Sequence, residues 1–520
     1  MATVTSSPAV IRQDPRRWWA LAALVASMLV LGFDMTILNV ALPTMAGQLD
    51  ASTGEQQWMA DGYIVVFAAL MLPAGLLGDR FGRRRMLITG LGIFLVGSLV
   101  GALVDSVELV VLARAVMGLG GALVMPLAMA VLPALFAPGE RTKAVGIVSA
   151  ASALGAPLGP IVGGWLLDHF WWGSIFLINV PMVAIGITAC VFLLPETIDP
   201  SSPKVDVTST ALTATGLGTL IYAIIEAPVR GWGDPLILCM LGGSAALITA
   251  LVLRERHLAR PMLDMSLLRN RGFLLNTVAA TLVMFVLSGL MFVLPQYLQA
   301  VLGHDAFGTG LRMLPMMGGL LVAARGAEPV VRKFGPRAVI SAGLVVLAFA
   351  AILGSRTTAA SGYGFTALWL TVAGLGFGFA VVPSMDSALG ALPVERAGSG
   401  AGLLLTVRQV GSAVGIALLG SLLSSVYVDR LDTGGSLPDA AADTAGQSVV
   451  AAHAVAERLG VPGLVDSADE AYIDGMVTVL LVSGIAALVT ALLVAALLPK
   501  TTPTPPDDTD MARQSEDARQ

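Results

Sequence analysis

Three charged side chains lie inside apolar stretches that are long enough to cross a membrane, and they are the groups in this chain best suited to chemistry. Asp34 interrupts the stretch LVLGFDMTILNVALP, residues 29–43, and Asp61 and Arg114 interrupt two further apolar runs. A charge in the membrane costs several kcal/mol unless it is paired or hydrated, and it usually faces a cavity. Desolvation favours the neutral form of a carboxyl group, whereas a nearby arginine favours its charged form. Asp34 is therefore expected to exchange a proton, and the proton and a cationic substrate are expected to compete for this one negative site.

Helix geometry places these three charges in the same half of the membrane. At 1.5 Å per residue, Asp34 lies about 24 Å along a helix that starts near Trp18, and Arg114 lies about 9 Å along its own helix from the opposite side. Asp61 lies about one turn deep from that opposite, outer side. The three are not required to touch. Two alternatives stay open: Asp34 forms a structural pair with Arg114 or a capping bond, and Asp61 faces the outer surface.

The composition is that of a polytopic membrane protein. The chain has 520 residues, of which 56% are hydrophobic and 12% are charged, and its mean hydropathy is +0.82. Soluble domains carry about 25% charged residues. Cys190 and Cys239 lie in apolar segments, so neither a disulfide framework nor a metal-binding spacing is expected. The four histidines lie outside the apolar runs, and no phosphate-binding loop or basic patch with aromatic residues occurs. No enzyme, cofactor, metal or nucleic-acid partner is therefore expected.

Fourteen apolar runs approach the roughly 20 residues that a spanning helix needs. An all-α fold follows, because isolated strands would leave backbone groups unpaired in lipid. The runs cover residues 18–43, 56–77, 86–104, 108–134, 143–167, 174–194, 209–227, 234–253, 273–300, 310–331, 338–355, 363–388, 398–424 and 475–498.

The distribution of positive charge predicts the orientation and the domains. Of the 30 lysines and arginines, 22 fall in loops on one side and 4 on the other, so both termini are expected in the cytoplasm. The first apolar run is interpreted as a membrane span that is retained, not as a signal peptide that is cleaved off.

A weak repeat, Arg80–Phe81–Gly82 and Lys333–Phe334–Gly335, indicates two related halves. We expect a cytoplasmic N-terminus (1–17), a six-helix bundle (18–194), two extra helices with a linker (195–272), a second six-helix bundle (273–498) and a disordered cytoplasmic tail (499–520). The long outer loop 425–474 is interpreted as a solvated surface loop, with a short helix possible within 441–460.

Four stretches, in this order, resemble the major facilitator superfamily. They are LGFDMTILNVALP (31–43), GLLGDRFGRRRML (75–87), LARAVMGLGGA (112–122) and GIVSAASALGAPLGPIVGG (146–164). The likeness extends into FLINVP (176–181), EAPVRGWG (226–233), PMLDMSLLRNRGF (261–273) and ERAGSGAGLLLTVRQVG (395–411). It points to the fourteen-helix drug:proton antiporters of the quaternary-ammonium efflux type. The resemblance implies the major-facilitator fold, with two six-helix bundles and two extra central helices, in the cell membrane, and a monomer is expected.

The stretch 75–87 resembles the family's cytoplasmic gating motif. The resemblance implies a gating role, rather than a plain positive-inside anchor, for Gly75, Gly78, Asp79, Arg80, Gly82, Arg83 and Arg84. The two helical glycines would let helices approach closely. The acid can pair with Arg83 or meet the N-terminus of a neighbouring helix. In the second copy, Glu328 and Arg332 stand where the first has Gly75 and Asp79. Four residues apart on a helix, they are expected to attract each other.

The stretch 146–164 resembles the marker of antiporters in this superfamily. Its small residues are expected to form one smooth packing surface, and its proline favours a kink because it removes a backbone donor. The resemblance implies that this stretch forms a seal that sets the geometry for export. Ordinary packing of small residues is compatible with that role. The residues are Gly146, Gly155, Gly159, Pro160, Gly163 and Gly164.

The remaining candidates come from the resemblance and from charge within spans. Arg114 matches the family's proton-transfer arginine, although Met117 stands where a glutamine is usual. Glu226 matches an acid at the outer end of the seventh helix, or is an ordinary loop acid. Asp386 and Arg408 are further candidates for proton coupling or substrate binding. Methionine and aromatic side chains suit a site that binds varied ligands, so Met284, Phe285, Met291, Phe292, Gln296 and Tyr297 are expected to line the pocket or to pack in the core.

Together these features predict a proton-coupled antiporter that exports hydrophobic, often cationic drugs, dyes, antiseptics or antibiotics across the cytoplasmic membrane. The expected partners are such small molecules, protons and the lipid bilayer. The alternative is a dedicated exporter of a single natural product or lipid.

Overall fold

The computed structural model describes residues 17–136, 138–198, 206–258, 261, 265–358, 361–392, 397–433 and 437–499. Every regular element in these ranges is helical, as the sequence predicts. The predicted N-terminal segment before residue 17 and the tail from residue 500 lie outside the described residues.

Two groups of long helices make up most of the molecule. The first group contains α1 (Arg17–Leu49), α2 (Thr53–Phe81), α3 (Arg83–Leu103), α4 (Val107–Leu135), α5 (Pro138–His169), the short α6 (Ser174–Leu177) and α7 (Asn179–Leu193). The second contains the short 3₁₀ helix η1 (Met265–Arg269), α10 (Arg271–Gln296) with its π-helical extension η2 (Tyr297–Val301), α11 (Ala306–Phe334), α12 (Pro336–Gly354), α13 (Tyr363–Gly390), α14 (Ala397–Arg430) and α17 (Gly463–Leu497).

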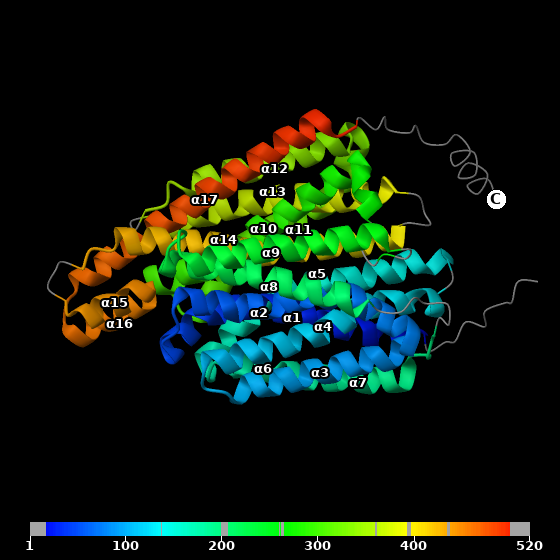
Figure 1. Ribbon diagram of the computed structural model, residues 1–520, viewed down its shortest axis with the longest axis horizontal. Coiled ribbons are helices and arrows are strands. Elements are labelled where there is room, and N and C mark those ends of the chain that lie inside the picture. The colour runs from blue at the N-terminus through cyan, green and yellow to red at the C-terminus, as the bar shows by residue number, and fades with distance from the viewer. Residues whose placement is uncertain are drawn as a thin grey trace, which may run out of the picture.

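The long helices lie side by side, with the first group on one side of the molecule and most of the second on the other (Figure 1). Helices α2 and α5 of the first group pack against α14 and α11 of the second. Between the groups, α8 (Val207–Arg230) packs on α9 (Pro235–His257), α14 and α2. The additional helix pair therefore lies along the seam between the two groups.

Twelve described helices are long and apolar enough to cross a membrane, or thirteen if the bent pair Thr53–Met71 and Pro73–Phe81 is counted as one span. The chain is therefore a polytopic membrane protein. Interior packing relies on small residues. A side chain at Gly374 would collide with the Met316 carbonyl, and one at Gly376 would approach Gly343 and Leu347. Close approach of helices through glycine is the usual means of packing in lipid, where burial of apolar surface gives no driving force.

The segment 425–474 is largely helical rather than a loop, and the short helix expected within 441–460 is present as α16 (Val449–Leu459). Helix α14 continues to Arg430, α17 already begins at Gly463, and α15 (Asp439–Gln447) and α16 form a hairpin between them. The Ser448 hydroxyl accepts a hydrogen bond from Ala451 N, and Gly460 ends α16 in the left-handed conformation. Alanine-rich sequence with these caps favours helix despite its charge.

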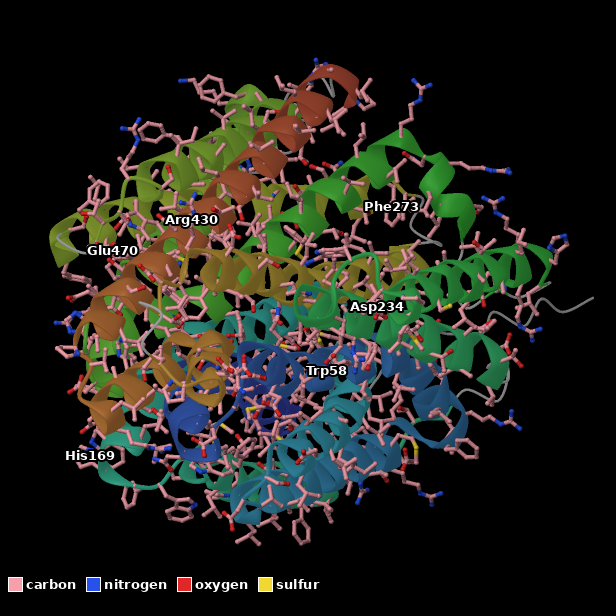
Figure 2. The ribbon with its side chains drawn as sticks, turned by 60° about the vertical axis from the view of Figure 1, so that its left-hand side comes forward. Trp58, His169, Asp234, Phe273, Arg430 and Glu470 are labelled. Carbon is pink, nitrogen blue, oxygen red and sulfur yellow. The ribbon has the colours of Figure 1, made fainter. Side chains whose placement is uncertain are left out.

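This hairpin lies at one end of the bundle, the hairpin end (Figure 1). The Thr53 hydroxyl at the start of α2 donates to the Gln447 carbonyl (3.0 Å), and Tyr427 of α14 donates to the Ala445 carbonyl (3.0 Å). Arg430 and Glu470 also lie at this end (Figure 2). The opposite end carries the α2–α3 turn and is called the Gly82 end.

Candidate functional site

Asp34 of α1 and Arg114 of α4 form a buried ion pair. The Arg114 Nη1 atom lies 2.6 Å from Asp34 Oδ2, and the side chains are 3% and 2% exposed. Arg114 Nε also donates to the Met59 carbonyl of α2 (3.4 Å). The sequence left contact between Asp34 and Arg114 open, and the structure shows that the two side chains are in contact. Such a pair is held in place because removing either charge would leave the other buried alone.

Three further residues complete the surroundings of this pair, and sequence reasoning did not single them out. Asn179 Nδ2 donates to Asp34 Oδ1 (3.2 Å) and to Ser98 Oγ (3.0 Å). The Arg114 guanidinium lies over the Tyr63 ring, with its carbon 4.6 Å from the ring centroid. An asparagine inside the apolar stretch FLINVP was a usable signal, because a buried amide needs polar partners.

Asp61 is fully buried and does not join this pair. Its two carboxylate oxygens have no hydrogen-bond partner among the described residues. On α2 it lies one turn after Gln57, which binds α14, and one turn before Val65, which packs with α8. Its side chain is thus on the helix face toward α8 and α14, and the predicted surface-facing alternative is wrong. Helix α8 covers this face of α2, and the sequence alone does not show that contact.

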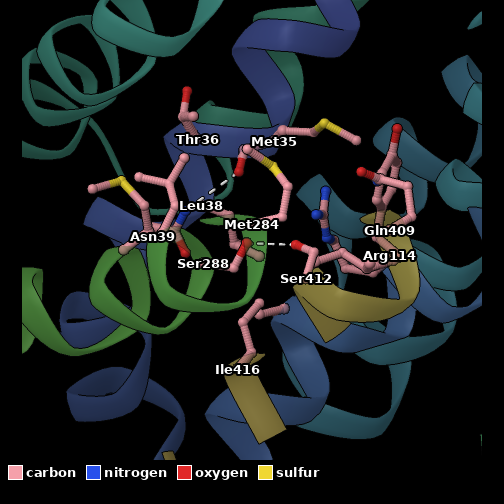
Figure 3. A pocket seen from close by; sticks show the side chains of 15 residues that line it. Met35, Thr36, Leu38, Asn39, Arg114, Met284, Ser288, Gln409, Ser412 and Ile416 are labelled. Carbon is pink, nitrogen blue, oxygen red and sulfur yellow. Dashed lines mark hydrogen bonds between the residues drawn. The ribbon is translucent and has the colours of Figure 1, made fainter. Parts of the chain in front are cut away.

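A cavity of about 160 Å³ lies between the two helix groups, next to Arg114 (Figure 3). Its volume is roughly half of the 300 Å³ at the lower end of drug-binding pockets, so the walls are drawn together in this conformation. Among the described residues of the lining, Arg114 is the one that carries a charge, and Asp34 is not part of this lining. The lining residues are Met35, Thr36, Leu38, Asn39, Ala60, Tyr63, Ile64, Arg114, Met284, Leu287, Ser288, Met291, Gln409, Ser412 and Ile416.

Of the aromatic and sulfur-containing residues expected to line the pocket, α10 contributes Met284 and Met291 only. Phe292, Gln296 and Tyr297 are buried in the core instead, and Phe285 packs against that core. The difference follows from helix rotation, because residues seven apart share one face and their neighbours turn away. Core packing, the alternative noted above, therefore holds for the larger part of this set.

The hydrogen bonds that we find between the two groups all lie toward the hairpin end. Gln57 Nε2 of α2 donates to the Ile416 and Ala417 carbonyls of α14 (3.0 and 2.9 Å). Gln299 Nε2 donates to the Val40 carbonyl (2.7 Å), and Phe307 N donates to Asp168 Oδ2 (3.2 Å). The described parts of the two groups are thus tied together at this end.

The stretch 75–87 forms a compact polar cluster at the Gly82 end. Arg83 Nη2 lies 2.7 Å from Asp79 Oδ1, and Arg83 Nη1 donates to the Ala130 carbonyl of α4 (2.7 Å). This is the predicted pairing of the acid with Arg83. A side chain at Gly78 would collide with Leu127 of α4, whereas one at Gly75 would meet nothing within 4 Å. The expected close approach therefore involves Gly78 alone, because Gly75 lies on an open face of α2.

An acid that follows α7 organises the start of α3, and the sequence analysis missed it. Glu196 Oε1 accepts from Arg84 N (3.1 Å), and Arg84 Nη2 donates to the Val191 carbonyl (2.5 Å). Gly82 has φ +106° and a side chain there would collide with Glu196, so glycine is required on both counts. Arg80 is exposed, and its guanidinium lies over the Phe81 ring.

The glycines of α5 serve two partners rather than one surface. A side chain at Gly155, Gly159 or Gly163 would collide with α1, around Gly32, Thr36 and Ile37. Gly164 instead lies against Ala306 and Phe307 of α11, and Gly310 of α11 lies against the Pro160 carbonyl. One residue further along a helix is a 100° turn, so Gly164 faces the second group. The surroundings of Gly146 lie outside the described side chains.

The other predicted residues lie apart from the central pair. Glu226 Oε2 accepts from Arg230 Nε within α8 (3.1 Å). Arg408 Nη1 donates to Met385 Sδ (3.1 Å), and Asp386 lines a separate cavity at the Gly82 end. Glu328 and Arg332 form the expected pair on α11, exposed to solvent.

Comparison with known proteins identifies the family. The family model of the Major Facilitator Superfamily matches residues 24–416. The tetracenomycin C resistance and export protein of Streptomyces glaucescens is 34% identical over 79% of this chain and 76% of its own length. The multidrug efflux pump LfrA of Mycolicibacterium smegmatis is 32% identical over 94% of this chain and 98% of its own length. A probable actinorhodin transporter of Streptomyces coelicolor is 35% identical over 81% of this chain and 75% of its own length.

The fold agrees with this comparison. A bacterial homolog of the human lysosomal transporter Spinster, solved in an inward-facing and unoccupied conformation, superposes with a TM-score of 0.69 at 18% identity, over 94% of this chain and 100% of its own. At that identity the likeness concerns the fold alone. With a family model that covers most of the chain, the conclusion is that this protein belongs to the major facilitator superfamily.

Proposed function

We propose that the protein is a proton-coupled antiporter that exports hydrophobic, often cationic small molecules across the cytoplasmic membrane. The observation that carries the proposal is the buried Asp34–Arg114 pair beside the central cavity. Its relatives include a multidrug efflux pump and antibiotic export proteins. A transporter needs a group that binds H⁺ in one part of its cycle and releases it in another, and a buried carboxylate is such a group.

The exchange follows from the electrostatics of the pair. While Asp34 is ionised, it holds Arg114 in place and the pair is neutral overall. Protonation of Asp34 removes the attraction, so Arg114 is left with an unpaired positive charge at the cavity wall, where it repels a cationic substrate. A proton and a cationic substrate thus exclude each other. Asp61 is proposed as a second proton carrier, because an ionised carboxylate without a partner is costly to bury.

The remaining predicted features complete the transport cycle. We propose that α2 and α5 join the twelve candidate spans, so that fourteen helices cross the membrane, with both termini and the Gly82 end in the cytoplasm. The cluster around Asp79, Arg83 and Glu196 would then control the cytoplasmic gate. The glycines of α5 would let this helix move against α1 and α11. The protein is proposed to act as a monomer, built from bundles 18–194 and 273–498 around the linker 195–272.

The test is transport in proteoliposomes that contain the purified protein and ethidium. An imposed pH gradient should drive ethidium movement, and an uncoupler should abolish it. Transport that ignores the pH gradient would contradict proton coupling, and no transport of any hydrophobic drug would contradict the export function. Asp34→Asn should insert normally and fail to couple.

A dedicated exporter of one natural product is the second candidate. The relatives named for tetracenomycin C and actinorhodin favour it, at 34% and 35% identity. A panel of structurally unrelated drugs separates the two. Transport of many of them supports the broad exporter, and transport of one chemical scaffold alone supports the dedicated one.

A further inference from the structure

A second cavity, larger than the central one, opens at the Gly82 end between α11 and α13. Its volume is about 570 Å³, within the range of 300–1,000 Å³ typical of pockets for drug-sized ligands. Its apolar wall consists of alanine, valine and proline side chains, among them Val331 and Pro383. The charged residues of the lining are Arg325, Glu328 and Asp386.

The cavity lies beyond the glycine contacts that join α11 and α13. Along their middle, α11 and α13 touch at glycines: a side chain at Gly319, Gly374 or Gly378 would collide with the partner helix. In the alignment of the two repeats on Phe-Gly, Val331 stands where α2 has Gly78, the residue that brings α2 against Leu127 of α4. A valine cannot allow the same approach, and it lines the cavity instead.

Two opposite charges face this cavity without being paired. Glu328 is held by Arg332, its neighbour on α11. Arg325 and Asp386 line the same cavity, yet neither forms a salt bridge among the described residues. The two side chains belong to different helices, and both line the cavity. By contrast, the part of the central cavity's lining that the structure describes contains the charged Arg114 and no carboxylate.

We propose that this cavity binds zwitterionic amphipathic small molecules, with an ammonium group at Asp386, a carboxylate at Arg325 and an apolar body on Val331 and Pro383. Each charge of such a ligand meets its opposite, and neither protein charge is left alone. A purely cationic ligand would meet the repulsion of Arg325, and a purely anionic one that of Asp386. The role of the cavity as a cytoplasmic loading site rests on the proposed export function and its orientation, whereas the binding preference does not.

The test uses three probes that share one fluorescent ring system: ciprofloxacin, which is a zwitterion near neutral pH, its methyl ester, which is a cation, and N-acetyl-ciprofloxacin, which is an anion. Binding to the purified full-length protein is measured by fluorescence titration. The wild type should bind ciprofloxacin about fivefold more tightly than either derivative, since one charge pair near 4 Å in water contributes about that factor. The preference should shrink as salt is raised, because the site is partly exposed.

Two variants assign the charges. Asp386→Asn should weaken ciprofloxacin and its ester about fivefold and leave the N-acetyl probe unchanged or improved. Arg325→Gln should weaken the binding of ciprofloxacin and of the N-acetyl probe about fivefold and leave the binding of the ester unchanged or improved. Glu470→Gln removes an acid at the hairpin end (Figure 2), and Arg458→Gln removes a base in the last turn of α16. Both variants should leave all three dissociation constants unchanged. Ala324→Phe, which fills the cavity without changing charge, should weaken all three probes.

The outcomes separate this inference from the proposed function. Equal binding of the three probes, or identical constants in wild type, Asp386→Asn and Arg325→Gln, overturns the zwitterion site even if pH-driven ethidium export is intact. Zwitterion-selective binding that both variants alter, without pH-driven transport, supports the site and contradicts antiport. If the site loads substrate, both variants should raise the KM for ciprofloxacin export about fivefold.

Discussion

Asp34 and Arg114 are 80 residues apart in the sequence, yet their side chains meet at 2.6 Å in the interior of the bundle. Asn179, from the last helix of the same group, binds the second oxygen of Asp34. The carboxylate is thus held by two helices besides its own. Under the proposed antiport, a proton that binds Asp34 would change the charge balance at the junction of three helices.

Breaking this pair should cost stability in a way that a double variant reveals. Asp34→Asn or Arg114→Gln alone leaves one buried charge unpaired and should lower the free energy of unfolding by about 3–5 kcal/mol. The double variant should cost less than the sum of the two, with a coupling of about 0.5–3 kcal/mol. Melting temperatures of the four detergent-purified proteins measure this, and strictly additive losses would show that the pair does not couple.

Asp61→Asn should separate stability from transport. The carboxylate has no partner among the described residues, so an amide of the same shape should change the free energy of unfolding by less than about 1 kcal/mol. If Asp61 carries an exchanged proton, pH-driven ethidium efflux should nevertheless fall sharply, because an amide does not titrate. Asp61→Glu is the matched control and should retain part of the activity. A wild-type pH profile in Asp61→Asn would remove this residue from the proton path.

The two glycines of the gating stretch should respond differently to the same substitution. Gly78→Ala forces a methyl group against Leu127 and should cost about 1–3 kcal/mol of stability. Gly75→Ala meets open space and should be neutral or stabilising by up to about 1 kcal/mol, because alanine favours the helix. Thermal unfolding of the two single variants is the measurement. Equal losses would mean that α2 and α4 are not in contact at Gly78.

Asp206 joins the extra helices α8 and α9, and its contribution should depend on pH. Its oxygens accept from Arg254 Nε and Nη2 (3.0 and 3.1 Å) and from the backbone of Thr208 and Ser209. The hydrogen bond from Arg254 is the main reason that the pKa of Asp206 lies below its usual value of 3.8. A carboxyl group whose pKa is lowered in the folded protein stabilises the fold at pH values above its unfolded pKa. This stabilisation is lost as the pH falls through the folded pKa.

The variant Asp206→Asn keeps a capping oxygen but loses the ion pair. Its melting temperature should differ from that of the wild type by a constant amount between about pH 5 and 8, and the difference should shrink below about pH 4. Asp206→Ala also loses the cap and should cost about 0.5–2 kcal/mol. A difference that grows on acidification would contradict the ion pair.

Much of the helical architecture is predictable because lipid imposes it. An apolar run of about 20 residues has one stable way to cross the bilayer, so most of the helices could be located from hydropathy alone. Local charge pairs were also accessible: residues four apart on a helix are neighbours, which is why Glu328 and Arg332, and Asp79 and Arg83, were foreseen.

The hairpin α15–α16 shows where composition misleads. The acidic residues of 425–474 suggested a solvated loop, but a helix can carry charge on one face and place Val449, Ala452 and Val455 on another. Whether such a face finds a partner depends on the surface beneath it, and that surface is built from distant helices.

The sequence by itself determined the class of the protein, the positions of most helices and the presence of charges in the membrane, because all three follow from local composition and helix geometry. Only the tertiary structure decided that Asp34 meets Arg114 and Asn179, that Asp61 is enclosed beneath α8, and that Arg325 and Asp386 share a cavity. These relations depend on the rotation and separation of helices far apart in the chain, which glycine contacts set and which no local pattern encodes.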